Sequence, residues 1–111
     1  MHLPIFWSQT AAVELCRKIE AICPEAGCHV ALTGGCLYKQ DFRKDLDLLF
    51  YRIRQVKKID MEKLWSKLRG VGIEKTSGFG WCYKCKYYDE RPIDCFFPEE
   101  QGGSQEYLLK P

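Results

Sequence analysis

The sequence lacks any apolar run approaching the roughly 18 residues that a membrane-spanning helix requires. Its opening stretch, MHLPIFWSQT, also lacks the basic region and long apolar segment of a secretory signal. These two absences predict a cytoplasmic protein without a membrane partner.

The sequence also lacks a large excess of charge of either sign. The chain carries 17 Lys and Arg against 15 Asp and Glu, which gives a net charge of +2. A protein that binds the nucleic-acid backbone normally concentrates many more cations than anions on one face. The balance therefore argues neither for nor against such a partner.

The length of 111 residues suits one hydrophobic core and falls short of two independent domains. Apolar residues make up 46% of the chain and aromatic residues 14%, which is a globular composition. We therefore predict a single domain over 1–111, with its core at about 10–98. The polar, glycine-rich stretch 101–104 predicts a flexible tail over 99–111.

The seven cysteines are odd in number and lie mostly among apolar neighbours, which predicts reduced, buried thiols. Cys82 and Cys85 are spaced as zinc ligands are, and Cys95 would add a third sulfur across a hairpin. Structural zinc sites usually have four ligands, however, and no second closely spaced pair or nearby histidine is present. Half-buried strand cysteines are the favoured interpretation.

Hydrophobic periodicity and turn residues predict two helices and four strands. The helices are expected at 10–22 and 61–70, with Ser8 or Thr10 and then Asp60 as N-caps, and the strands at 29–33, 45–53, 79–88 and 93–97. The turn chemistry of residues 89–92 predicts a hairpin between the last two strands. This order predicts an α+β fold, a small mixed sheet with helices packed on one face and the other face open.

The segment DLDLLFYRI at 45–53 is rich in large apolar and aromatic residues and begins with a period-two element, so it is predicted to be a strand. Alternation places Asp45 and Asp47 on the face opposite the large apolar residues. Asp94, from the last strand, is expected to join them on the open face. Clustered carboxylates are costly without cations, and their oxygens suit Mg2+ or Mn2+.

The Gly34–Gly35 pair follows the strand at 29–33 directly. Glycines at a strand end let backbone N–H groups approach phosphate oxygens closely. Arg43, which precedes the acidic pair, could meet a triphosphate as well, although a solvated strand edge also explains it. His29 is expected to be a hydrogen-bonded core residue.

The stretch LTGG, followed after nine residues by DLDL, resembles the motif of the polymerase-beta-type nucleotidyltransferase superfamily. The later IDCF, with Asp94, resembles the strand that brings the third carboxylate of that superfamily. The resemblance spans residues 29–97. Two features depart from the pattern: Gly35 stands where serine is commoner, and little chain follows Asp94 to bind an acceptor.

The resemblance implies that Gly34 and Gly35 hold the triphosphate, that Asp45 and Asp47 bind metal, and that Asp94 binds metal and helps activate the acceptor. The implied reaction transfers a nucleoside monophosphate from a triphosphate such as ATP to a hydroxyl and releases pyrophosphate. The alternative is a non-catalytic nucleotide-binding or protein-interaction and regulatory module on the same fold. Such a module would resemble small members of the superfamily in mobile elements and toxin–antitoxin systems.

The acceptor hydroxyl is expected on a partner protein or on a nucleic-acid end, and self-association into a homo-oligomer is left open. Asp94 has a simpler alternative of its own: it could pair with Arg91 or with a lysine of the neighbouring strand.

Overall fold

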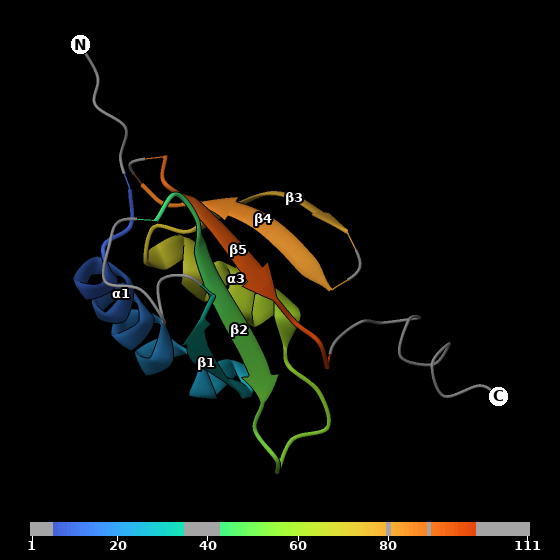
Figure 1. The fold of residues 1–111 in the computed structure, drawn as a ribbon. Coiled ribbons are helices and arrows are strands. Elements are labelled where there is room, and N and C mark those ends of the chain that lie inside the picture. The colour runs from blue at the N-terminus through green and yellow to red at the C-terminus, as the bar shows by residue number, and fades with distance from the viewer. Residues whose placement is uncertain (1–5, 35–42, 80, 89, 100–111) are drawn as a thin grey trace, which may run out of the picture.

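Two α-helices, a short 3-10 helix and five strands make up the part of the chain that this computed structural model describes, residues 6–34, 43–79, 81–88 and 90–99. In chain order they are α1 (Gln9–Ile22), η1 (Pro24–Ala26), β1 (Cys28–Thr33), β2 (Leu46–Arg52), α3 (Met61–Gly70), β3 (Glu74–Phe79), β4 (Cys82–Lys86) and β5 (Pro92–Phe96). Figure 1 shows α1 and α3 on the same side of the sheet. The predicted α+β class, with helices on one face, is confirmed.

The sheet has the strand order β1-β2-β5-β4-β3. Strands β2 and β5 run parallel, and the remaining neighbours are antiparallel, so the sheet is mixed as predicted. The chain leaves β2, passes through α3 and the β3–β4 hairpin, and returns as β5 beside β2 (Figure 1). This crossover places the start of β2 next to the start of β5.

The helices begin where short polar side chains cap them. Ser8 Oγ accepts a hydrogen bond from the backbone N–H of Ala11 at 3.0 Å, and Asp60 Oδ1 accepts from Lys63 at 3.1 Å. Each cap satisfies a backbone donor that the first helical turn leaves unpaired. No helix within the described ranges is long and apolar enough to cross a membrane.

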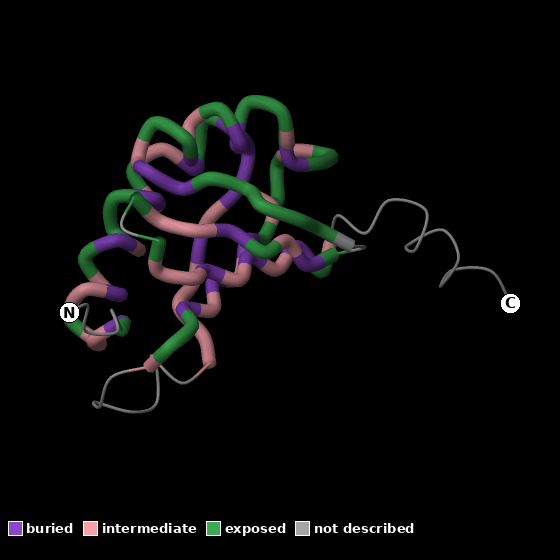
Figure 2. Tube along the Cα trace, turned by 90° about the horizontal axis from the view of Figure 1, so that it is seen from above, coloured by how far each residue is buried: buried purple, intermediate pink, exposed green. Residues whose placement is uncertain are grey.

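The core lies between the helices and one face of the sheet, and Figure 2 shows buried segments concentrated there. Leu46, Leu48 and Phe50 are completely buried, as the alternation of β2 predicts. Trp7 is buried too, and its Nε1–H donates to the backbone oxygen of Pro92 at 2.8 Å. The core therefore extends before residue 10, where the sequence placed its beginning.

The predicted strand over 79–88 is confirmed at 82–86, which form β4, but its bounds are too wide. Residues 74–79 form the edge strand β3, and a turn at Trp81 separates it from β4. Residues 74–78, EKTSG, are all exposed, so they carry no apolar alternation for sequence reasoning to detect. Lys75 attaches this strand to the core side, because its ammonium lies 5.0 Å from the ring centres of both Trp65 and Tyr83.

The other edge of the sheet is covered by a side chain of α1. Glu20 accepts a hydrogen bond from the backbone N–H of Val30 at 3.0 Å, and its second oxygen lies 2.6 Å from His29 Nδ1. His29 is hydrogen-bonded, as predicted, but it is half-exposed beside Tyr51 rather than in the core. The prediction failed because β1 is an edge strand, and one of its faces points away from the helices.

The described cysteines are free, and all except the half-buried Cys16 are buried. Cys82 pairs with Phe96 and Cys85 with Ile93, so the two thiols lie on opposite faces of β4. They cannot ligate one zinc ion together. Cys85 lies on the core face instead, 3.8 Å from the sulfur of Cys95.

Candidate active site

One row of side chains crosses four neighbouring strands on the sheet face opposite the helices. Thr33 pairs with Asp47, Asp47 with Asp94, and Asp94 with Lys84. Paired residues of adjacent strands point to the same face. We call these four residues the carboxylate row. The parallel register of β2 and β5 thus brings together two aspartates that the sequence separates widely.

The third predicted carboxylate lies at the border of this row. Asp45 directly precedes β2 and is exposed. Its negative charge acts on Asp47, which shows that the two groups lie within electrostatic reach. The structure therefore brings Asp47 and Asp94 side by side, with Asp45 near them just before the start of β2.

The environment of Asp47 opposes its ionisation. Partial burial is the largest cause that raises the pKa of the Asp47 carboxyl group, followed by the negative charges of Asp94 and Asp45. The positive charge of Lys84 acts in the opposite direction but does not cancel these effects. A divalent cation would favour the ionised form that protein groups alone disfavour.

This shift predicts a pH dependence of stability in metal-free buffer. Because the folded-state pKa of Asp47 is raised, the folded chain binds more protons than the unfolded chain between the unfolded value, about 3.9, and the folded value. The protonated Asp47 carboxyl group therefore contributes to the free energy of unfolding at low pH. This contribution is lost as the pH rises through the folded-state pKa of Asp47. Urea unfolding from about pH 4 to 8 should show an advantage of Asp47→Asn at neutral pH that vanishes in acid. An advantage that does not change with pH would contradict the assignment.

Gly34 meets Asp47 at the end of β1. Its φ is +72°, in the left-handed region that favours glycine, and a Cβ atom built there would overlap the Asp47 carboxylate. Only glycine therefore fits without moving the aspartate. Gly35, its predicted companion at the triphosphate, lies outside the described residues.

Asp94 forms an ion pair with Lys84. The Lys84 Nζ atom lies 3.1 Å from Asp94 Oδ1, and the Asp94 side chain is 13% exposed against 51% for Lys84. Arg91, the other partner considered for Asp94, instead stacks over the Trp7 ring at 4.0 Å. The ion pair and a catalytic role are compatible, because a cation on Asp94 offsets its repulsion with Asp47.

Arg43 is placed by its backbone. It exchanges two hydrogen bonds with Trp7, with N–O distances of 2.7 and 2.8 Å. This bridge holds the segment that leads into Asp45 against the N-terminal end of the described chain. The contact of the Arg43 side chain with a triphosphate stays a prediction.

The donor chemistry of the row fits Mg2+ or Mn2+, which take carboxylate oxygens. Across the residues that the structure describes, no group of three Asp, Glu, His or Cys side chains is arranged to hold a metal ion. One Asp94 oxygen is engaged by Lys84. Metal binding by Asp47 and Asp94 stays a prediction.

The alternative that Asp94 pairs with a lysine of the neighbouring strand is confirmed, but sequence reasoning did not say that this lysine is Lys84. The signal that could have found it is the hairpin register, because residues equally distant from the turn pair with each other. Lys86 pairs with Pro92, so the position two residues earlier, Lys84, must pair with Asp94. Locating the turn centre from residues 87–91 would have given this pair.

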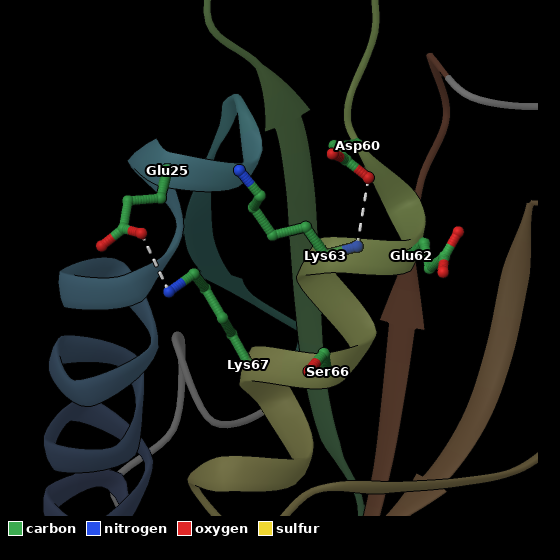
Figure 3. A pocket seen from close by; sticks show the side chains of 6 residues that line it. All are labelled: Glu25, Asp60, Glu62, Lys63, Ser66 and Lys67. Carbon is green, nitrogen blue, oxygen red and sulfur yellow. Dashed lines mark hydrogen bonds and ion pairs between the residues drawn. The ribbon is translucent and has the colours of Figure 1, made fainter.

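A surface recess of about 500 Å3 lies elsewhere, between η1 and α3 (Figure 3). Its lining is charged, and Lys67 spans it to reach Glu25 at 3.0 Å. It adjoins η1, which leads into Cys28 at the start of β1, whereas Asp47 pairs with Thr33 at the end of β1. The recess is therefore at the far end of the sheet from the carboxylate row.

Comparison by sequence finds no matching protein-family model and no matching curated protein. Comparison by structure does find similar folds. Polymerase beta of Leishmania infantum, solved as a ternary P/T complex, matches with a TM-score of 0.62 and 14% identity over 84% of this chain and 43% of its own. The Cid1 poly(U) polymerase, solved with Mg and 3′-dATP bound, matches with a TM-score of 0.57 and 17% identity, over 91% of this chain and 33% of its own. A cytoplasmic RNA terminal U-transferase matches with a TM-score of 0.55 and 16% identity, over 91% of this chain and 30% of its own.

These similarities show that the chain has the fold of polymerase-beta-type nucleotidyltransferases. The chain spans less than half the length of each of these solved structures. At such low identity the likeness shows the fold alone.

Proposed function

We propose that the chain is a metal-dependent nucleotidyltransferase that transfers a nucleoside monophosphate from a nucleoside triphosphate to a hydroxyl acceptor. The observation that carries the proposal is the pairing of Asp47 with Asp94 on the open face of the sheet, with Gly34 packed against Asp47. Like charges side by side oppose folding unless a cation or a reaction uses them.

In this proposal each residue of the site has a distinct part. Asp45, Asp47 and Asp94 provide the carboxylate oxygens for Mg2+ or Mn2+. When bound there, these ions would neutralise charge on the triphosphate and would make the acceptor hydroxyl more acidic. The Gly34–Gly35 backbone and the Arg43 side chain hold the triphosphate against the start of β2.

The reaction then proceeds by one displacement. The acceptor oxygen forms a bond to the α-phosphorus, and the bond from that phosphorus to the bridging oxygen of the β-phosphate breaks. Pyrophosphate leaves with the bridging oxygen, and the hydroxyl proton passes to the carboxylate of Asp94.

The second candidate is a nucleotide-binding or regulatory module on the same fold. The ion pair of Lys84 with Asp94 favours it, because an internal cation already balances one of the carboxylates. The two candidates differ in one observable property, which is covalent transfer of label.

The test is incubation of the purified chain with each α-phosphate-labelled triphosphate and Mg2+ or Mn2+, with cell extract as the source of acceptors. We expect label in a macromolecule, and its loss in an Asp45→Asn/Asp47→Asn double variant, because both metal-binding carboxylates are removed. A chain that binds triphosphate by calorimetry but transfers no label would favour the binding module. Transfer that persists in the double variant would contradict the proposed site.

A further inference from the structure

We propose that Lys84 is the internal counter-ion of the carboxylate row and that it sets the concentration of divalent metal at which the site becomes occupied. The inference rests on the proposed function, because it concerns regulation of the same site. It makes Lys84 a positioning residue, which acts on the reaction through Asp94.

The register places Lys84 where it can act in this way. Asp94 lies between Asp47 on one side and Lys84 on the other, all on the open face. The ammonium group is 3.1 Å from Asp94 Oδ1, and Asp94 is the more buried partner. The lysine therefore neutralises the carboxylate that has less access to water.

A metal ion and Lys84 compete for this oxygen. Mg2+ binds carboxylate oxygens at about 2.0–2.1 Å, which would place it within a few ångströms of an ammonium group on the same atom. Two cations that close repel each other strongly. Metal binding through Asp94 Oδ1 therefore requires Lys84 to swing away.

The Lys84 side chain is free to move away from Asp94. Half of its side chain is exposed, and its flexible stem can carry the ammonium group into water. Because water screens the half-exposed lysine end of the ion pair, the competition raises the metal concentration needed without preventing binding. In the absence of metal the same contact holds Asp94 beside Asp47 and reduces their repulsion.

The neighbouring Lys86 provides a matched control. It lies two residues further along β4, points to the same face, and forms an ion pair of the same length, 3.1 Å, with Glu90. Lys86→Met removes the same charge and a comparable ion pair without touching the carboxylate row. Lys84→Arg keeps a cation that can still pair with Asp94.

The experiment is a calorimetric titration of the full chain with Mn2+ alone, comparing the wild type with Lys84→Met, Lys84→Arg, Lys86→Met and Asp47→Asn. We expect Lys84→Met to bind Mn2+ roughly three- to tenfold more tightly than the wild type. Lys86→Met and Lys84→Arg should stay close to the wild type. Thermal unfolding in chelator should show Lys84→Met folded but destabilised, and Lys84→Gln serves if the methionine variant does not fold.

An unchanged or weaker Mn2+ affinity in Lys84→Met, with binding by the wild type that disappears in Asp47→Asn, overturns this inference and leaves the proposed function standing. An equal gain in Lys86→Met also overturns it, because the effect would then come from general charge. Absence of Asp47-dependent Mn2+ binding in every variant overturns the proposed function itself.

Discussion

Replacement of Asp47 by asparagine is expected to lower nucleotide transfer by about 10²–10³-fold or more, the loss typical when one group that stabilises transition-state charge is removed. Asparagine keeps the size and part of the hydrogen bonding of aspartate but loses its negative charge. The fold should therefore persist, and Mn2+ should not raise the unfolding temperature of the variant, whereas we expect it to raise that of the wild type. Single-turnover transfer and thermal unfolding, each with and without Mn2+, measure both effects.

Asp60→Asn is the matched control for this change. Asp60 caps α3 through its side chain, and asparagine caps helices about as well as aspartate. The same chemical change at this remote position should leave transfer and the Mn2+ effect unaltered. Equal activity of Asp47→Asn and the wild type would remove Asp47 from the site.

Substitution of Gly34 by alanine is expected to damage both stability and activity. The left-handed backbone conformation alone costs an alanine about 1–2 kcal/mol, and the added methyl group would overlap the Asp47 carboxylate. We expect a lower free energy of unfolding, measured in urea, and loss of transfer even at temperatures where the variant is folded.

Gly70→Ala provides the comparison at a site without these constraints. A Cβ atom on Gly70 would meet nothing within 4 Å, and the residue ends α3. Alanine there should be neutral or stabilising by up to about 1 kcal/mol, with activity unchanged. Equal behaviour of the two variants would mean that Gly34 does not position Asp47.

Much of the site follows from local patterns in the sequence. The alternation of β2 places Asp47 opposite Leu46 and Leu48, and the turn before β5 fixes the face of Asp94. Both depend on period-two geometry, which a few neighbouring residues determine. The face of the two aspartates was predictable because Leu46, Leu48 and Phe50 occupy the other side of β2.

Other features depend on contacts that no local pattern contains. Trp7 is buried because its indole group reaches Pro92, 85 positions away in the chain. The edge strand β3 is held by its backbone pairing and by Lys75, so its polar residues resemble a loop in sequence. Tertiary context decides both cases, and propensity alone cannot.

The order of strands in the sheet also makes the two contacts of Asp94 unequal in entropy. Asp94 follows Lys84 by 10 positions and Asp47 by 47 positions. Closing the longer loop costs about 1.4 kcal/mol more in chain entropy than closing the shorter one. The hairpin of β4 and β5 thus contains both the acid and its counter-ion, whereas the pair of carboxylates exists only when the crossover is complete. A local opening that releases β2 would separate Asp47 from Asp94 and leave Asp94 with its lysine.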